Sequence, residues 1–394
     1  MTVKAVILDL DGTLIDEVSG KPVPGIEQML EDLHKDDLKI AVASNKSRAA
    51  RKLKQAGLEP DFLLTRSVVK ENKGSPKWVY KACEAFSVES NELLILGDSD
   101  LDMRTAVNAR VIYFHAGWSK PSYRYGILVR EPWVFRVMVR EFFMKSIYWY
   151  WWLQNRDSAG RPIAARAMVD SRGAGIDVFQ NDLVQFLKEG GSPRVGRFSL
   201  RGFVMLHLLG SIYGSGLYRR ADTWTTYPGS GSDANAALGP ILFYASRLFR
   251  DRYVDYLFIR HRHAVDSGEA RRRGERHLID FPNQINTVHL NEQHRSAVED
   301  KAILVVDDFE TEGYSMECAR NLLLEAGASE VMCVSISKYR KPRFLLTPAD
   351  GYTWDPFVPV THAPGAFDQR YAHETRNNAA LGVIRQSYQR LKRT

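Results

Sequence analysis

Short apolar runs rich in β-branched residues alternate with helical stretches from Val3 to about Trp118. KAVILDL, LKIAVAS and ELLILGD read as strands, and a helix is expected near Gly25 to His34. Continuous apolar strands separated by helices predict a parallel sheet covered on both faces. Each run ends in polar residues, at the position where open α/β sheets bind ligands. The first part of the chain is therefore predicted to be an α/β domain with a site at its strand ends.

The same alternation begins again near Arg220. ADTWTTYPGSG reads as a strand and a loop, NAALGPILFYASRLF as a helix, VDYLFIRHRH as a strand, and AILVVDDFETEGYS as a strand and a loop. A helix follows, with Met316, Ala319 and Leu323 at helical spacing and Gly327 as its C-terminal cap; ASEVMCVSIS is the next strand. We predict an α/β chain of two Rossmann-like parallel-sheet domains joined by a helical aromatic segment.

The domain boundaries are predicted at 1–118, 119–199, 200–345 and 346–394. The second range is aromatic and contains no recognised motif, so we interpret it as a helical linker or a hood. Four charges at the centre of the stretch 133–153 are costly in hydrocarbon. A helix packed between domains is expected there, and an interfacial membrane helix is the alternative. The last range is predicted to be an irregular extension with one terminal helix.

Composition narrows the class of protein. The 394 residues are 44% hydrophobic and 26% charged, which is typical of a globular protein and excludes a disordered chain or a membrane protein. The net charge of +7 favours anionic ligands but is too small to predict nucleic-acid binding. The cysteines Cys83, Cys318 and Cys333 are widely spaced, which indicates neither disulfides nor a zinc site. The apolar run at the N-terminus is too short for a signal peptide, so we predict a cytoplasmic location.

Two carboxylates, Asp9 and Asp11, follow the first predicted strand and project on the same side of the chain. One can attack phosphorus while the other transfers the leaving-group proton, so that an acyl phosphate divides the hydrolysis into two easier steps. Ser44 and Asn45 end the next strand and can donate hydrogen bonds to phosphoryl oxygens. Lys73 supplies a cation that balances the charge. This set predicts phosphoryl-transfer chemistry.

GDSDLD ends another strand and contributes Asp98 and Asp102, hard oxygen ligands suited to Mg²⁺. The chain resembles the haloacid dehalogenase superfamily of phosphatases at all four motifs of that superfamily. The matching positions are Asp9, Asp11, Ser44, Lys73, Asp98 and Asp102. The resemblance implies Asp9 as the nucleophile, Asp11 as the acid and base, and Asp98 as a magnesium ligand. We assign the metal site to Asp9, Asp11, Asp98 and Asp102.

Two alternatives accompany this assignment. Lys77 can replace Lys73, because the chain has KGSP where many members of the superfamily have KPxP. The second alternative is that the domain is a degraded, inactive copy of a phosphatase, although no catalytic position is replaced. Only short segments follow the first and second motifs, so the site is predicted to lack a cap domain.

A second constellation lies at ILVVDDFETEGYS. Asp307 and Asp308 end an apolar strand and can accept hydrogen bonds from ribose hydroxyls. The loop that follows opens a helix, where backbone amides, the Thr311 and Ser315 hydroxyls and the helix dipole can hold a phosphate. These groups together are suited to a 5-phosphoribosyl group.

This constellation resembles the phosphoribosyl-diphosphate signature of type I phosphoribosyltransferases. Upstream, YPGSGSD resembles the loop that binds diphosphate, and the arginines that follow it, including the run 271–274, resemble the mobile basic loop. The likeness is greater to the competence-associated branch than to the purine-salvage enzymes. The residues assigned to phosphoribosyl diphosphate are Gly229, Ser230, Gly231, Arg260, Arg262, Asp307, Asp308, Thr311, Glu312, Gly313, Tyr314 and Ser315.

These observations lead to a hypothesis and two alternatives. The hypothesis is a bifunctional phosphatase and phosphoribosyltransferase of nucleotide or nucleoside metabolism, using Mg²⁺, phosphorylated small molecules, phosphoribosyl diphosphate and an unidentified acceptor base. The first alternative is a phosphatase with a regulatory domain that binds phosphoribosyl diphosphate or RNA. The second is a phosphatase that processes nucleic-acid ends. No membrane partner is expected, and self-association into a homo-oligomer is left open.

Overall fold

The structure, a computed structural model, describes residues 2–122, 125–145, 148–156, 160, 162–171, 178–189, 193–230, 237–265 and 267–393. It divides into two compact units. The first contains Met1–Ser146, Leu209–Gly216 and Leu248–Arg250. The second contains Ile147–Leu208, Leu217–Arg247 and Asp251–Thr394. The first unit therefore combines segments that are far apart in the sequence.

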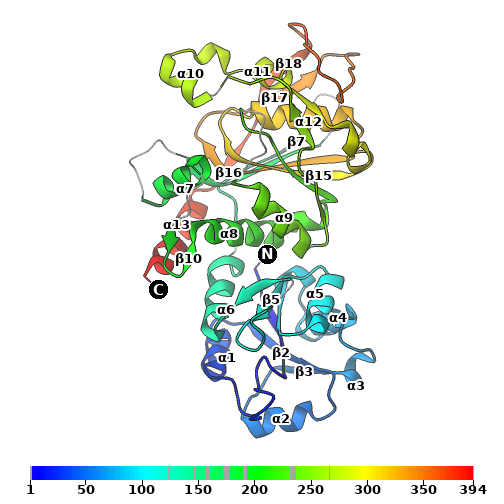
Figure 1. The fold of residues 1–394 in the computed structure, drawn as a ribbon, viewed down its shortest axis with the longest axis vertical. Helices are drawn as coiled ribbons and strands as arrows, with labels where there is room; N and C mark the ends of the chain where they lie inside the picture. The colour runs from blue at the N-terminus through cyan, green and yellow to red at the C-terminus, as the bar shows by residue number, and fades with distance from the viewer. Residues whose placement is uncertain are drawn as a thin grey trace. The chain divides into compact units, whose positions relative to one another are not determined.

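A six-stranded parallel sheet forms the first unit, in the order β3-β2-β1-β4-β5-β6 (Figure 1). Its strands are β1 (Ala5–Asp9), β2 (Lys39–Ser44), β3 (Phe62–Thr65), β4 (Leu93–Gly97), β5 (Tyr113–Ala116) and β6 (Ile127–Val129). Its helices are α1 (Ile26–Lys35), α2 (Ala49–Ala56), α3 (Arg66–Val69), α4 (Lys77–Phe86), α5 (Asp100–Asn108) and α6 (Pro132–Met138). Helices α1 and α6 contact each other on one face, and α4 and α5 on the other. The predicted parallel sheet with two covered faces is confirmed.

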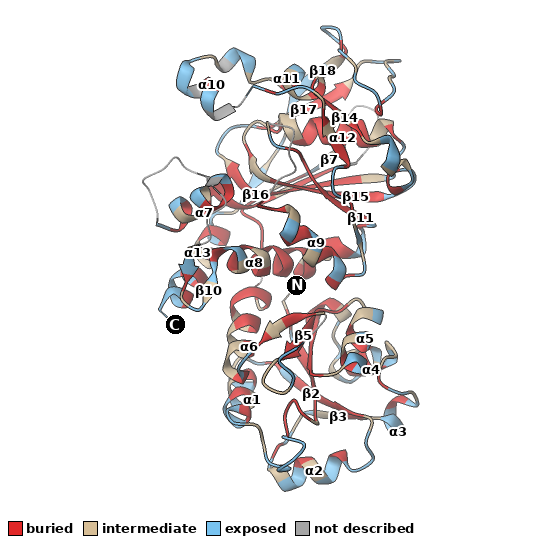
Figure 2. Cartoon of the chain, viewed as in Figure 1, coloured by how far each residue is buried: buried red, intermediate tan, exposed pale blue. Residues whose placement is uncertain are grey.

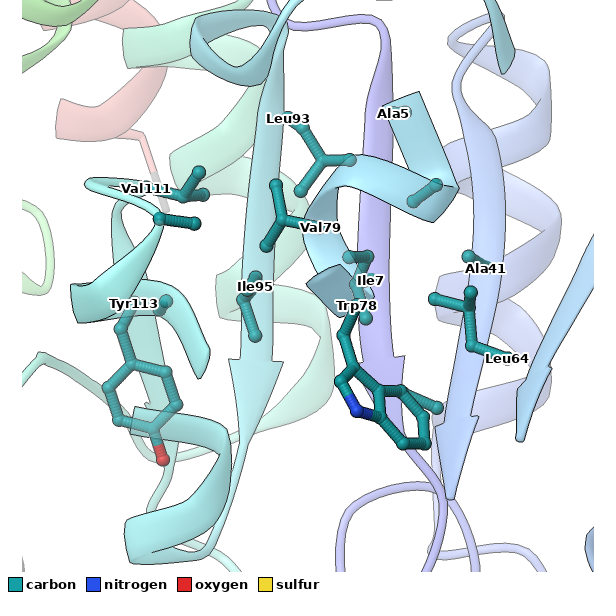
Figure 3. Packing of buried hydrophobic residues seen from close by; sticks show 14 of the residues in the cluster. Ala5, Ile7, Ala41, Leu64, Trp78, Val79, Leu93, Ile95, Val111 and Tyr113 are labelled. Carbon is teal, nitrogen blue, oxygen red and sulfur yellow. The ribbon is translucent and has the colours of Figure 1, made fainter. Parts of the chain in front are cut away.

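Burial on both faces explains why the strands of this sheet are apolar throughout. Every residue of β1 and β4 is buried (Figure 2). On one face, Trp78 and Val79 of α4 pack among Ile7, Leu93 and Ile95 of the two central strands (Figure 3). This packing fixes the carboxyl ends of β1 and β4 beside each other, where the polar residues follow.

The second unit is built on a seven-stranded mixed sheet, in the order β12-β11-β15-β16-β8-β7-β19. The strands from β12 to β8 are parallel, and β7 runs antiparallel to both β8 and β19. The strands of this sheet are β7 (Trp151–Arg156), β8 (Pro162–Ser171), β11 (Thr223–Thr226), β12 (Arg252–Tyr253), β15 (Ala302–Glu310), β16 (Glu330–Tyr339) and β19 (Thr375–Arg376). The strands predicted at ADTWTT, AILVVDD and SEVMCVSIS are therefore neighbours in one parallel array.

Smaller elements complete this unit. Its two-stranded pairs are β9 (Arg194–Val195) with β10 (Phe198–Ser199), β13 (Phe258–Arg260) with β14 (Val288–Leu290), and β17 (Phe344–Pro348) with β18 (Phe367–Tyr371). The helices are α7 (Val178–Glu189), α8 (Leu200–Gly214), α9 (Gly239–Leu248), α10 (Ser267–Arg273), α11 (Phe281–Ile285), α12 (Tyr314–Glu325) and α13 (Asn378–Lys392), of which α8 and α9 end within the segments of the first unit. The predicted terminal helix is α13, but the extension before it also contains the β17-β18 hairpin.

The segment 119–199 was predicted to be helical, but it is helical only in part. After α6 and the π-helical turn Val139–Phe143, the chain forms the antiparallel strands β7 and β8. In β7, Trp151 and Leu153 are buried while Gln154 is exposed, so the aromatic run follows a strand's alternation where it pairs with β8. Pairing across the sheet overrides the local resemblance to a helix.

Two expectations on the class of protein can be compared with the described residues. None of the described helices is long and apolar enough to cross a membrane. The cysteines Cys83, Cys318 and Cys333 are free.

Candidate functional site

The carboxyl ends of β1, β2 and β4 bring the predicted phosphatase residues together. Asp9 is the last residue of β1, Ser44 is the last of β2, and Asp98 follows the last residue of β4. Because β1 lies between β2 and β4 in a parallel sheet, all of these groups meet at one edge. Asp102 joins them from the first turn of α5.

Three buried carboxylates form the centre of this site. Each of Asp9, Asp98 and Asp102 offers one oxygen, and these oxygens lie within 4.8 Å of one another. Gly12 leaves room beside them: it has a φ of +83°, and a Cβ there would collide with the Asp98 carboxylate. Hard oxygen donors gathered in this way fit Mg²⁺. The Asp11 side chain, also assigned to the metal, lies outside the trio.

Lys73 is the buried cation beside the carboxylate trio. Its buried ammonium group forms ion pairs with Asp9 and, at 2.8 Å, with Asp102. Its backbone N–H donates to Asn45 Oδ1 at 3.0 Å, which ties the loop after β2 to the loop that carries the lysine. The alternative cation, Lys77, pairs instead with Glu71. The geometry therefore favours Lys73 for the role.

Asp11 faces a different set of partners. Its carboxylate is paired with Lys52 and, at 3.4 Å, with Lys46, and it accepts a hydrogen bond of 3.5 Å from Ser44 Oγ. Burial alone would raise the pKa of Asp11, but hydrogen bonds and charge from Lys52 and Lys46 lower it overall. Asp11 is thus held in its ionised form by two lysines, outside the carboxylate trio.

Asp9 has the opposite electrostatic character. Burial and the neighbouring charge of Asp102 raise the pKa of Asp9 to about 7, although Lys73 acts against them. For Lys73, burial lowers the pKa, but Asp102 and Asp9 raise it overall. The two aspartates of the first motif therefore occupy distinct environments in the metal-free protein.

Binding of Mg²⁺ should depend on pH because Asp9 must lose its proton to act as a ligand. With a pKa of about 7 in the metal-free protein, Asp9 is mostly protonated at pH 6 and mostly ionised at pH 8. We expect the dissociation constant to be about tenfold larger at pH 6 than at pH 8. Calorimetry in two buffers of different ionisation enthalpy should also detect the released proton. Equal affinities at both pH values would contradict this expectation, and Asp9→Asn should bind with a weaker dependence on pH.

A cavity of about 520 Å³ in the second unit contains most of the other predicted site. Asp307 and Asp308 lie at the end of β15, and the loop 311–315 leads into α12, which starts at Tyr314. The predicted residues that line the cavity are Gly229, Ser230, Arg260, Asp307, Asp308, Thr311, Glu312, Gly313, Tyr314 and Ser315. Arg262 does not line it and donates to Asn286 O at 2.8 Å, while Gly231 lies outside the described residues.

Asp307 is buried, and Asp308 is half-buried beside it. Burial raises the pKa of Asp307 well above its ordinary value, and the charge of Asp308 adds to the effect. The Asp308 N–H donates to Asp307 Oδ1 at 2.9 Å. Two carboxyl groups desolvated in this way gain from hydroxyl donors, since each donor replaces lost water contacts.

Two buried cations, Lys338 and Arg343, contact the loop 311–315. Gly313 adopts a φ of +87°, and a Cβ there would lie 2.8 Å from the Arg343 side chain. The Lys338 ammonium group donates to the carbonyl oxygens of Thr311 and, at 2.7 Å, Lys341. Glu312, the unusual acid of the loop, pairs with Lys341 at 3.3 Å. These contacts hold the Thr311 carbonyl group and the Glu312 side chain in place.

Sequence reasoning missed other residues of this cavity. Lys188 comes from α7, Tyr227 precedes the Gly229 loop, and Tyr339 ends β16. The position of Tyr339 at the end of a parallel strand could have indicated it. No motif surrounds Lys188, so the sequence carried no signal for it.

The comparisons with known proteins concern the first unit. Residues 17–116 match the profile of the haloacid dehalogenase-like hydrolase family. The bifunctional phosphonoacetaldehyde hydrolase/aminoethylphosphonate transaminase of Clostridioides difficile (strain 630) is 31% identical over 94 residues, which are 22% of this chain and 15% of that protein. The chain thus covers only a small part of this curated relative. The profile match contains Ser44, Lys73 and Asp98, whereas Asp9 and Asp11 lie just before it.

Solved structures similar to the chain include a haloacid dehalogenase superfamily hydrolase from Geobacter sulfurreducens PCA. It is 19% identical, with 33% of this chain and 96% of that chain covered and a TM-score of 0.29. A phosphatase of the same superfamily from Thermococcus onnurineus is 18% identical, with 34% and 96% covered and a TM-score of 0.32. On the family match, residues 17–116 belong to a haloacid dehalogenase-like hydrolase domain.

Proposed function

We propose that the chain is a magnesium-dependent phosphomonoester phosphatase joined to a phosphoribosyltransferase, and that both act in nucleotide or nucleoside metabolism. The phosphatase half rests on one observation: Asp9 lies within a trio of buried carboxylates, with the Lys73 ammonium group paired to it. The trio would hold Mg²⁺, and the bound ion would supply positive charge to the phosphoryl oxygens.

Asp9 is the nucleophile in this proposal. One of its oxygens bonds to phosphorus and the bond to the leaving oxygen breaks. Asp11, which Lys46 and Lys52 hold ionised in the free site, takes up a proton from water when the substrate binds and donates it to that oxygen. Water then attacks the aspartyl phosphate, gives a proton to Asp11 and releases inorganic phosphate. Ser44 Oγ and the Asn45 amide nitrogen are the donors for the phosphoryl oxygens, and Asn45 Oδ1 already accepts from Lys73 N.

The phosphoribosyltransferase half is supported by the cavity of the second unit. Asp307 and Asp308 can accept hydrogen bonds from the two ribose hydroxyls, and the loop 311–315 offers N–H groups and hydroxyls to the 5-phosphate. Arg260 donates to the carbonyl oxygens of Pro228 and Gly229, so its role is to position the loop expected to bind diphosphate.

The reaction proposed for this cavity is a substitution at the anomeric carbon of phosphoribosyl diphosphate. The bond from this carbon to the diphosphate oxygen breaks, and a bond to a nitrogen of the acceptor base forms. The product is a 5′-nucleotide, which is a phosphomonoester. The phosphatase half could then convert such a product, or a related metabolite, into a nucleoside and inorganic phosphate.

Binding of phosphoribosyl diphosphate with Mg²⁺ should stabilise the second unit. At a ligand concentration of about one hundred times the dissociation constant, stabilisation is roughly 2.7 kcal/mol, which raises the melting temperature by about 5 °C in a unit of this size. Asp307→Asn combined with Asp308→Asn should remove most of that shift, whereas Asp350→Asn, at an exposed position of the same unit, should retain it. An equal shift in the double variant would contradict the ribose-binding role.

Turnover separates this proposal from a regulatory domain. Purified protein, Mg²⁺ and phosphoribosyl diphosphate incubated with a metabolite extract should release diphosphate and yield a new nucleotide or nucleoside. A ligand-induced shift without diphosphate release for any acceptor would instead favour a domain that only senses phosphoribosyl diphosphate.

A further inference from the structure

Two lysines beside Asp11, Lys46 and Lys52, add positive charge to the phosphatase site beyond what the transferred phosphate needs. Lys46 and Lys52 both contact the Asp11 carboxylate, Lys46 at 3.4 Å. Lys46 also reaches Glu17 at 3.4 Å, but both of those side chains are more than half exposed. Such an exposed pair contributes little. Two ammonium groups thus share one buried carboxylate.

The two lysines lie on the leaving-group side of the site. In the proposed mechanism Asp11 contacts the oxygen of the leaving alcohol, so the groups that touch the Asp11 carboxylate lie beside that alcohol. Lys73, in contrast, is enclosed with Asp9 and Asp102 on the nucleophile side. Lys120 also lies on that side, since it pairs with Asp98 at 3.1 Å. The site therefore separates its cations into Lys73 and Lys120 beside the carboxylate trio and Lys46 and Lys52 beside Asp11.

The elements that carry these lysines are local and well defined. Lys46 follows Asn45 in the loop after β2, and Lys52 lies in α2, on a side chain that is about one-third exposed. Between β1 and β2, which are fully described, the chain forms only a loop and α1, so no cap domain is inserted there. The lysines can therefore contact a small substrate directly.

We infer that the phosphatase prefers phosphomonoesters whose leaving group bears a second anionic group, a carboxylate or a phosphate, close to the ester oxygen. This inference rests on the proposed phosphatase function. When the leaving oxygen engages Asp11, Lys46 and Lys52 lose part of the buried partner that they share, and a nearby anion of the substrate replaces it. An uncharged leaving group leaves that charge unmatched beside the buried Asp11 carboxylate, where Coulomb interactions are stronger than in water.

A matched pair of substrates tests the inference. 2-Phosphoglycerate and glycerol 2-phosphate differ in that a carboxylate replaces a hydroxymethyl group next to the ester carbon. We expect kcat/KM to be about tenfold higher for 2-phosphoglycerate, the effect of one favourable ion pair near a protein surface. In Lys46→Met combined with Lys52→Met this ratio should fall to near one.

Control variants distinguish specificity from general damage. Lys52→Arg keeps the charge and should retain most of the ratio. Lys54→Met removes an exposed lysine from the same helix and should change neither the ratio nor the turnover. Melting temperatures of all variants establish that they are folded.

The possible results separate this inference from the function on which it rests. Turnover of p-nitrophenyl phosphate with equal kcat/KM for the matched pair would overturn the inference alone. Equal losses for both substrates in the double lysine variant, with the ratio intact, would also overturn it, because the lysines would then serve the transferred phosphate. The absence of turnover with every substrate would overturn the phosphatase function and the inference together.

Discussion

Asp9→Asn should abolish phosphomonoester hydrolysis while the protein stays folded. An asparagine amide cannot form the acyl phosphate, so we expect kcat with p-nitrophenyl phosphate and Mg²⁺ to fall by at least about a thousandfold. The fold should tolerate the change, because burial and Asp102 already disfavour the ionised form of Asp9. A neutral side chain of the same shape removes that cost in the metal-free protein, at the loss of the ion pair with Lys73.

A matched control supports this reading. Asp37 is exposed and has a φ of 60°, a left-handed conformation that asparagine accepts more readily than most residues. Asp37→Asn should therefore keep both activity and melting temperature. Retention of more than about a tenth of the wild-type turnover in Asp9→Asn would be too much for a lost nucleophile and would contradict the assignment.

The first site could be predicted because several of its residues lie at or directly after strand ends. Apolar runs define β1, β2 and β4, and a parallel sheet brings their carboxyl ends to one edge whatever the intervening loops contain. Asp9, Ser44 and Asp98 thus converge from positions far apart in the sequence. The pairing of Lys46 and Lys52 with Asp11 was not predicted, because it depends on how α2 packs after β2.

The second unit shows where such reasoning fails. The aromatic stretch that ends at Leu153 resembles a helix in composition, but its last residues, from Trp151 on, form a strand because they pair with β8. The acid pair and loop after β15 were found from the sequence because they are contiguous. Arg343 was not found, since it follows β16 by several residues and its importance comes from buried partners distant in the sequence.

Arg343 is the centre of a buried ion network beneath the loop 311–315. Its guanidinium group pairs with Glu310 at 2.9 Å and with Glu317 at 2.7 Å, and its side chain is fully buried. Glu317 also pairs with Arg320 at 2.9 Å and accepts from Leu346 N at 3.0 Å. Glu310 ends β15 and Glu317 lies in α12, so the network joins the strand before the loop to the helix after it.

Arg343→Met should therefore destabilise this region strongly. Methionine fills much of the volume but leaves Glu310 without its cation and Glu317 with only Arg320, and breaking a buried pair in this way typically costs about 3–5 kcal/mol. Hydrogen exchange of peptides from β15 and α12 measures the loss locally, which avoids assuming a single unfolding transition in a chain of two units. Arg252→Met, at an exposed position of the same sheet, should change exchange by less than about 0.5 kcal/mol.

A second substitution tests whether the cost arises from charge left unpaired. Glu310→Gln in the Arg343→Met background removes one of the two stranded carboxylates, so the double variant should be more stable than additivity of the single variants predicts. The coupling should not be complete, because Glu317 keeps its charge. Since Arg343 also packs against Gly313, the same variants should weaken the thermal shift caused by phosphoribosyl diphosphate. A loss of less than about 1 kcal/mol in Arg343→Met would mean that water reaches the network and screens it, and the loop would then owe its shape to Lys338 and the backbone.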